Sequence, residues 1–224
     1  MIHEANIRRV FDLADRIDLE EGMKAYRAYQ QTMAGLAGRY GCTLEQATAV
    51  FVSLSPNNAY LQNLRSAATV LAAHRAGIPK ERVITSTYNH CRDRAFQFLD
   101  GADFLSATKG PKIRAFYSNI VNPSDPEPVT IDGHMIGVWF GHPITMKSAA
   151  YLKVRYHEIA GGFRDVAAGL GLIPNQLQAV LWFTWKRINR VAFDPRLSLF
   201  GAGNQWRNYI PAEEIKTYPV RAAA

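Results

Sequence analysis

Helical periodicity is the feature that most constrains how this chain can fold. Apolar residues recur at helical spacing along most of its 224 residues, and strong strand alternation is missing. The pattern predicts two helices within 5–40, and Thr43, followed by Glu45 and Gln46, has the form of a helix start. Further helices are predicted at 44–54, 57–76, 87–99, 112–120, 149–169 and 175–190, with a short element at 102–107. The sequence therefore predicts an all-α fold.

One stretch between these helices cannot be helical. Residues 122–128 hold three prolines, which lack the N–H that a helix interior requires. Val129, Thr130 and Ile131 follow, and their β-branched side chains would ordinarily favour a strand. Because this run is short and lies between helices, we interpret it as an extended lead into a helix that begins near Asp132.

Composition narrows the class of partner. The formal charge of +7 and the pI near 9.5 favour an anionic partner, since clustered Lys and Arg displace counterions from phosphates. Cys42 and Cys91 are too few for an all-cysteine zinc site or a disulfide framework. The N-terminus has no signal-peptide pattern, and no apolar run approaches the ~20 residues of a membrane span. We expect a cytoplasmic protein without a membrane segment, ordered except near 222–224.

A glycine-bearing turn and a carboxylate carry the chemistry. Residues 105–113, Leu-Ser-Ala-Thr-Lys-Gly-Pro-Lys-Ile, place a tight turn between two short helices. Backbone N–H groups at the start of the second helix can hold a phosphate, and Lys112 would face the same anion. Asp132 follows twenty residues after Lys112, at a predicted helix N-terminus, and His134 comes two residues later.

This arrangement resembles the helix-hairpin-helix DNA glycosylase superfamily. The hairpin of that superfamily reads Leu-Pro-Gly-Val-Gly-x-Lys and is followed about twenty residues later by Val-Asp-x-His. The matching residues are Gly110, Lys112, Asp132 and His134. The chain departs from the pattern where Ser-Ala at 106–107 replaces Pro-Gly, where Lys109 replaces the second small residue, and where the hairpin is one residue longer.

Two further segments extend the resemblance in the same order along the chain. Residues 53–58, Ser-Leu-Ser-Pro-Asn-Asn, are similar to the superfamily's Leu-Ser-x-Gln/Asn-Asn segment, whose polar side chains fill the gap left by an extruded base. Residues 173–182 are similar to its late helix. The resemblance implies two closely packed helical lobes with the site between them. One lobe, at about 44–140, contains the hairpin, and helices at 5–40 and 149–190 form the other.

The resemblance implies a DNA glycosylase with lyase activity in which Lys112 and Asp132 are the catalytic pair. Asp132 would stabilise positive charge on the sugar of an extruded base, and Lys112 would attack the sugar carbon to form a Schiff base. Contacts to DNA are expected from Asn57, Asn58, Lys109, Gly110, Arg114 and His134. No metal-ligand spacing surrounds the histidines, so we expect neither a metal nor a cofactor. The expected location is the nucleoid of a bacterial or phage-infected cell.

These residues also have purely structural alternatives. Lys112 can be a solvated lysine or a phosphate contact at a helix start, and Asp132 can be an ordinary N-cap. His134 can be a packed or capping histidine, and Asn57 and Asn58 can be turn residues.

Other side chains have two interpretations as well. Two groups of cations can either track a DNA backbone or form a solvated face: Lys186, Arg187 and Arg190, and Arg92, Arg94, Lys109 and Arg114. The aromatic residues Trp182, Phe183 and Trp185 surround a helix, so most belong to the core and one can line a base pocket.

Two other functions stay open at this stage. The same fold can carry base hypermodification, in which a group is transferred to an activated hydroxymethylpyrimidine in DNA, and the irregular turn at 106–112 favours that alternative. A non-catalytic DNA-binding protein would keep the scaffold for recognition alone. Lys112 separates these functions, because an excision enzyme and a transferase can both use the Asp132 carboxylate.

Overall fold

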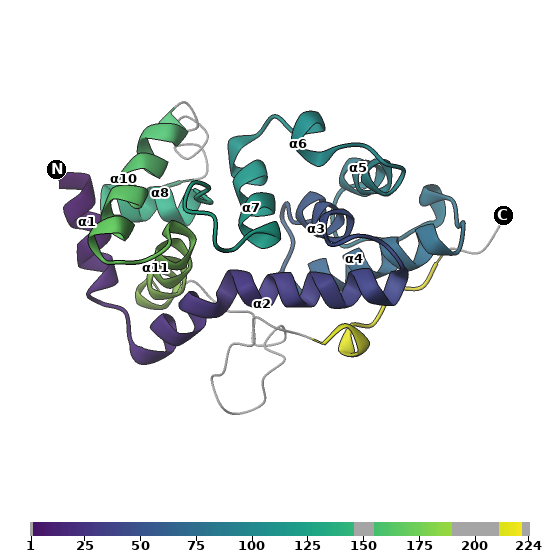
Figure 1. Cartoon of the computed structure of the whole chain (residues 1–224), viewed down its shortest axis with the longest axis horizontal. Helices are drawn as coiled ribbons and strands as arrows, with labels where there is room; N and C mark the ends of the chain where they lie inside the picture. The colour runs from purple at the N-terminus through teal and green to yellow at the C-terminus, as the bar shows by residue number, and fades with distance from the viewer. Residues whose placement is uncertain (1, 146–154, 190–210, 221–224) are drawn as a thin grey trace. The chain divides into compact units, whose positions relative to one another are not determined.

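The chain is built from helices, as the computed structural model shows for residues 2–145, 155–189 and 211–220 (Figure 1). The elements are α1 (Ile2–Phe11), α2 (Arg16–Tyr40), α3 (Leu44–Ser53), α4 (Tyr60–Arg75), η1 (Lys80–Arg82), α5 (Asn89–Leu99), α6 (Phe104–Ala107), α7 (Pro111–Val121), α8 (Gly133–Phe140), α10 (Tyr156–Gly169), α11 (Pro174–Ile188) and η3 (Ala212–Glu214). One isolated antiparallel bridge joins Val83 and Val220. The all-α prediction is confirmed.

Local chemistry sets several of the helix starts. Thr43 caps α3 with a capping box, since its side chain accepts from the Gln46 N–H at 3.1 Å and the Gln46 side chain accepts from the Thr43 N–H at 3.1 Å. The helix predicted from 57 begins only at Tyr60, because Asn57 has a φ of 51° and cannot continue a right-handed helix. The first part of the helix predicted at 149–169, Arg190 and 222–224 lie outside the described residues.

The chain divides into two compact units. Unit 1 comprises Met1–Arg27 and Ser118–Asn208, and unit 2 comprises Ala28–Tyr117 and Tyr209–Ala224. Both α2 and α7 continue across a boundary between the units. The helices expected at 5–40 are therefore shared between the units. The helix α8, expected in the lobe with the hairpin, packs in unit 1 because its apolar residues join the core of that unit.

The core of unit 1 lies among α1, α8, α10 and α11 (Figure 1). Its fully buried side chains include Ile7 and Val10 from α1, Met135 from α8, and Phe163 from α10. Residues 129 and 131 of the extended lead are also buried in this core. The lead is therefore a structural part of unit 1 and positions the helix that follows it.

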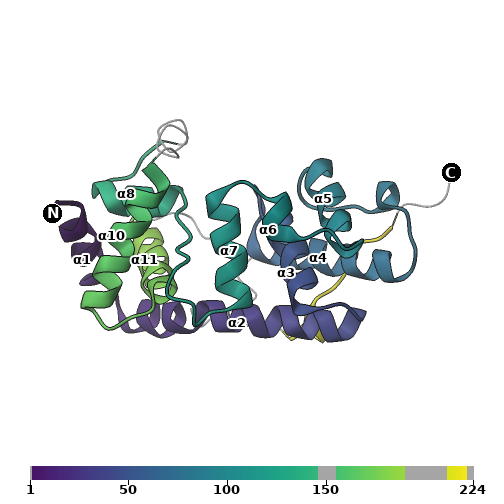
Figure 2. The same ribbon diagram turned by 45° about the horizontal axis from the view of Figure 1, so that its top comes forward.

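In unit 2, α3 packs against both α4 and α5 (Figure 2). All seven residues from Ala47 to Ser53 are buried, as expected for a helix that is surrounded by others. Phe51 lies 6.1 Å from Tyr60 and 6.0 Å from Phe116, measured between ring centroids. These contacts connect α3 to the start of α4 and to α7 within the unit.

Within the described part of the chain, no single helix is long and apolar enough to cross a bilayer. The helices α10 and α11 meet the length and composition criteria only as a pair, and that pair is bent by 100°.

Candidate active site

Asp132 is held at the N-terminus of α8. Its backbone is extended, and its Oδ1 accepts a hydrogen bond from the Met135 N–H at 2.9 Å. This bond satisfies one of the donors that every helix start leaves open. Asp132 is therefore the N-cap of α8. The prediction of a helix start at this residue is confirmed.

Buried hydroxyl groups fix the extended lead that ends at Asp132. The Tyr156 hydroxyl donates to the Val129 carbonyl at 2.6 Å and accepts from the Ile131 N–H at 3.2 Å. Burial raises the pKa of Tyr156 to about 12, so this hydroxyl keeps its proton at neutral pH. A side chain thus takes the place of a neighbouring strand, which explains how a β-branched run is stable without a sheet.

The side chain of Thr130 ties the same lead to other parts of unit 1. Its Oγ1 lies 3.0 Å from the Tyr26 hydroxyl and accepts from Asn119 Nδ2 at 3.0 Å. Tyr26 also donates to Gln178 Oε1 at 2.7 Å. Residues from four separate stretches of the chain therefore determine where the backbone turns into α8.

The last turns of α11 bring a lysine and an indole ring close to α8. Trp182 and Lys186 are four residues apart and so share one face of the helix. The Lys186 Nζ lies 3.9 Å from the centroid of the Trp182 ring, and His134 approaches that ring edge-on at 6.3 Å between centroids. We call Asp132, His134, Trp182 and Lys186 the unit 1 cluster.

The amine of this cluster, on Lys186, has a lowered pKa. Burial lowers the pKa of Lys186 to about 8, and the opposing attraction of the Asp132 carboxylate only partly offsets the loss of hydration. The amine therefore loses its proton far more readily than an exposed lysine does. Unit 1 therefore contains the Asp132 carboxylate and, within its electrostatic reach, a Lys186 amine that is partly neutral near physiological pH.

A close approach of α8 and α11 depends on Gly137. A Cβ built on this residue would lie 2.9 Å from Trp185 Cζ2 and 3.3 Å from the His142 carbonyl oxygen. Trp185 is buried, so its ring is packed within the core of unit 1. Glycine at this position is therefore required for the distance between the helices that carry Asp132 and Lys186.

Lys112 belongs to unit 2, whereas Asp132 belongs to unit 1. It is the second residue of α7, which begins at Pro111 after the short helix α6 and the turn 108–110. The Lys112 side chain is exposed, as is that of Lys109. A Cβ on Gly110 would meet no heavy atom within 4 Å, so the space beside this residue is open.

Arg114 stabilises this turn. Its Nη1 donates to the Leu105 carbonyl and, at 3.1 Å, to the Thr108 carbonyl. The predicted residues Lys109, Gly110 and Lys112 thus share one turn that Arg114 closes. In this arrangement the Arg114 guanidinium has a structural role beside any contact it makes to DNA.

The asparagines at the end of α3 close another turn of unit 2. Asn57 has a positive φ and donates from Nδ2 to the Tyr88 hydroxyl at 2.7 Å. Asn58 donates to the Leu54 carbonyl at 2.9 Å and accepts from the Ser86 hydroxyl at 2.8 Å. Both side chains stabilise the chain locally, which is the structural alternative considered for them.

Ion pairs engage several of the cations that can track DNA. Arg187 binds Asp18 through Nη2 at 2.6 Å and also pairs with Asp15 at 3.2 Å. Arg92 is buried and donates to Asp93 Oδ1 at 2.7 Å. These arginines hold neighbouring segments together, so charge alone overestimates the surface that is open to phosphates.

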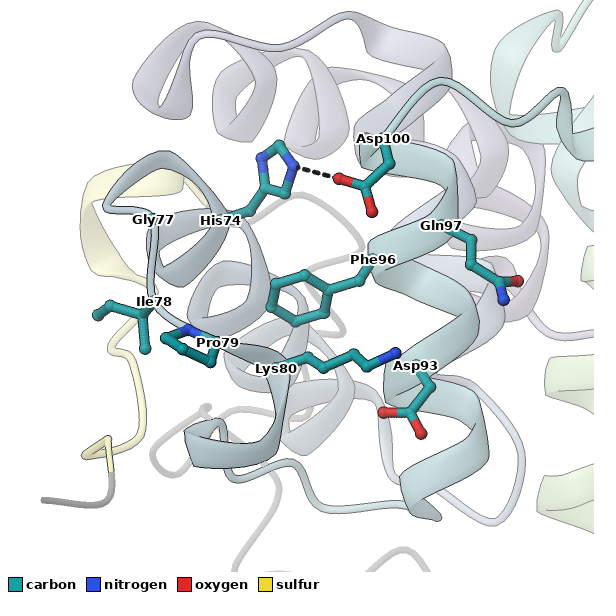
Figure 3. Close-up of a pocket in the computed structure, with 9 residues that line it drawn as sticks. All are labelled: His74, Gly77, Ile78, Pro79, Lys80, Asp93, Phe96, Gln97 and Asp100. Carbon is teal, nitrogen blue, oxygen red and sulfur yellow. Dashed lines mark hydrogen bonds and ion pairs between the residues drawn. The ribbon is translucent and has the colours of Figure 1, made fainter. Parts of the chain in front are cut away.

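A cavity of about 380 Å³ lies elsewhere in unit 2, beside α5 (Figure 3). His74 and Asp100 face each other on its wall, with Nε2 and Oδ1 3.1 Å apart, and the Phe96 ring lies between the two sides. None of the predicted site residues lines it. In the described part of the chain, no group of three or more His, Cys, Asp or Glu side chains is arranged to hold a metal ion.

Comparison with known proteins adds a family but no activity. The model of a family of unknown function (DUF7178) matches residues 2–189, which include the unit 1 cluster and the turn that carries Lys112. No curated protein and no solved structure matches the chain.

Proposed function

The chain belongs to this family of unknown function, DUF7178, and from its own residues we propose that it is a DNA base-excision enzyme, a DNA glycosylase with associated lyase activity. The observation that carries the proposal is the unit 1 cluster, where the Asp132 carboxylate is fixed at a helix start beside a desolvated amine and an indole ring. Carboxylate, amine and aromatic surface are groups that base excision with associated lyase activity can use.

The chemistry assigns a separate task to each group. Cleavage of the bond between base and sugar develops positive charge on the sugar, which a fixed carboxylate stabilises. An amine that attacks C1′ displaces the base, which leaves with the bonding electron pair and a proton, and the opened sugar remains as an imine. The resemblance implies Lys112 for the amine. The net charge of +7 supplies the attraction to phosphates that brings the duplex to the protein.

The test is release of free base from DNA. The full chain is incubated with duplexes that each carry one damaged or modified base, and the products are analysed by mass spectrometry. We expect one class of base to be released, and we expect Asp132→Asn to lower the rate by about 10²–10³-fold, in the range found for lost electrostatic stabilisation. If every nucleoside stays intact across the panel, base excision is excluded.

The second candidate function is base hypermodification on the same scaffold. The observation that favours it is the turn before α7, where Arg114 closes a longer hairpin and Lys112 is exposed. Mass spectrometry of nucleosides from hydroxymethyl- or pyrophosphoryl-modified DNA would then show a gain of mass with the bond between base and sugar intact. Binding without either reaction would instead support a non-catalytic DNA-binding protein.

A further inference from the structure

Two lysines of this chain lie at helix ends, and their surroundings differ. Lys112 is exposed at the start of α7. Lys186 is partly buried near the end of α11, in the same unit as Asp132. An amine attacks a carbon only through its neutral form, so these surroundings bear directly on which lysine can act as a nucleophile.

The contacts of Lys186 define where its amine lies. Nζ is 3.9 Å from the Trp182 ring centroid, and the Asp132 carboxylate is close enough to act on it electrostatically. Gly137 allows α8 to approach α11, and the hydroxyl of Tyr156 fixes the segment before Asp132. The carboxylate and the amine are therefore positioned by the packing of one unit, independent of the turn in unit 2.

Partial burial also prepares the amine for reaction. Because burial lowers the pKa of Lys186 to about 8, a larger fraction of its side chains is neutral near pH 7.5 than for a lysine at its ordinary value. The Trp182 ring beside the amine is at the same time a flat apolar surface of the kind on which an extruded base or an opened sugar can rest.

We propose that Lys186 is the amine that reacts with the sugar next to Asp132, in the role that the resemblance gives to Lys112. This inference rests on the proposed function and names the nucleophile of that same site. The substrate class it implies is DNA with an abasic sugar, either made by the enzyme itself or already present in the duplex.

The proposed step is the formation of an imine between Lys186 and the sugar. The neutral Nζ adds to the C1′ aldehyde carbon of the opened abasic sugar and forms a carbinolamine. The carbinolamine loses its oxygen as water, whose two hydrogens come from the amine, and the C1′–Nζ double bond remains. Borohydride added in the experiment delivers hydride to C1′ and converts the imine into a stable secondary amine.

The experiment identifies the lysine directly in the unmodified protein. The full chain is incubated with a duplex that carries one abasic site, reduced with borohydride, digested with protease and nuclease, and analysed by mass spectrometry. We expect the sugar remnant on Lys186. A remnant on Lys112, on Lys109 or on any other residue overturns the inference, and so does the absence of an adduct.

Two matched variants test the same assignment through the yield of adduct. Lys186→Gln should lower the yield of adduct by at least about 100-fold, whereas Lys24→Gln, which changes an exposed lysine of the same unit, should leave it within about threefold of the unmodified protein. Circular dichroism of both variants checks that the helices are retained. Loss of the adduct with Lys112→Gln and not with Lys186→Gln would assign the reaction to Lys112 and contradict the proposal.

Failure of this inference can be told apart from failure of the proposed function. The abasic substrate contains no base, so adduct formation does not depend on base release. An adduct on Lys186 without release of any tested base would support the inference and exclude excision. Base release without an adduct would support excision by water and exclude Lys186 as the nucleophile.

Discussion

The regions around Lys186 and Lys112 surround the same functional group differently, because one lysine is partly buried and the other is exposed. In unit 1, Lys186 lies against an indole ring and near a carboxylate, and burial lowers its pKa to about 8. In unit 2, Lys112 projects from a helix start into solvent. The comparison teaches that burial, and not sequence position alone, governs how readily the amine of a lysine loses its proton.

The backbone next to each region is also stabilised differently. A buried tyrosine hydroxyl binds the segment before Asp132, whereas the exposed Arg114 guanidinium binds the turn before Lys112. Loss of a buried partner leaves polar groups without water, whereas loss of an exposed partner leaves them hydrated. Changes in unit 1 should therefore cost more stability than equivalent changes in unit 2.

The largest effect is expected from Gly137→Ala. The new methyl group would lie 2.9 Å from the buried Trp185 ring, so α8 and α11 must separate and the free energy of unfolding should fall by about 3 kcal/mol. Gly133→Ala in the same helix is the matched control, because its Cβ would meet nothing within 4 Å and alanine favours a helix. Urea unfolding measures both, and equal stability of the two variants would refute the close approach.

Tyr156→Phe should have the next largest effect. It removes the partner of the Ile131 N–H and of the Val129 carbonyl in the core, which should lower the free energy of unfolding by about 2 kcal/mol. Asp132 would lose its fixed position as well, so base release should slow more than binding of DNA weakens. An unchanged unfolding midpoint in urea would mean that water or another group replaces the hydroxyl.

The pH dependence of stability tests the desolvation of Lys186. Its pKa is about 8 in the folded chain and near its ordinary value of about 10.4 in the unfolded chain, so the unfolded state binds more protons between these values. The contribution of this group to stability therefore rises with pH across that window. Lys186→Met should be more stable than the unmodified protein at pH 7 by about 1 kcal/mol, allowing for partial exposure.

Urea unfolding at pH 7 and pH 9.5 measures this difference. The advantage of Lys186→Met should shrink at the higher pH, where the amine is neutral in the folded chain. A constant difference between Lys186→Met and the unmodified protein would show that Lys186 has an ordinary pKa.

The smallest effect is expected from Arg114→Ala in unit 2. Arg114 itself is exposed, so water can enter where its side chain is removed, and the free energy of unfolding should fall by only about 0.5 kcal/mol. Arg114→Lys keeps the charge but not the two-carbonyl contact, and it separates the two roles of the side chain. If DNA affinity falls with Arg114→Ala and is retained with Arg114→Lys, the charge contacts DNA. If both lose affinity equally, the shape of the turn is what matters.

Local features of this chain could be predicted from the sequence. The capping box of Thr43 and Gln46 lies within four residues, and the cap formed by Asp132 depends on its own backbone and on the helix that follows. The turn before α7 could be predicted as well, because glycine and proline restrict the backbone wherever they occur. Each of these features needs only neighbouring residues.

The approach of Lys186 to Asp132 could not be predicted. These residues are distant in the sequence, and their proximity depends on how α8 and α11 pack. The four-residue spacing of Trp182 and Lys186 was visible and indicates a shared helix face, but it does not show which element that face meets. Likewise Arg187 was recognised as a cation, and only the fold shows that Asp18 binds it.

The division of unit 1 into two separated stretches has a consequence for its synthesis. Its first helix, α1, buries Ile7 and Val10 against α8, α10 and α11, which are encoded much later in the chain. At the ~5–20 residues per second of translation, α1 leaves the ribosome about ten to thirty seconds before α11. During that interval its apolar stripe has no native partner. Most of unit 2 is synthesised in that interval. The apolar side chains of α1 therefore stay without their native core, and open to aggregation, until α8, α10 and α11 have been synthesised.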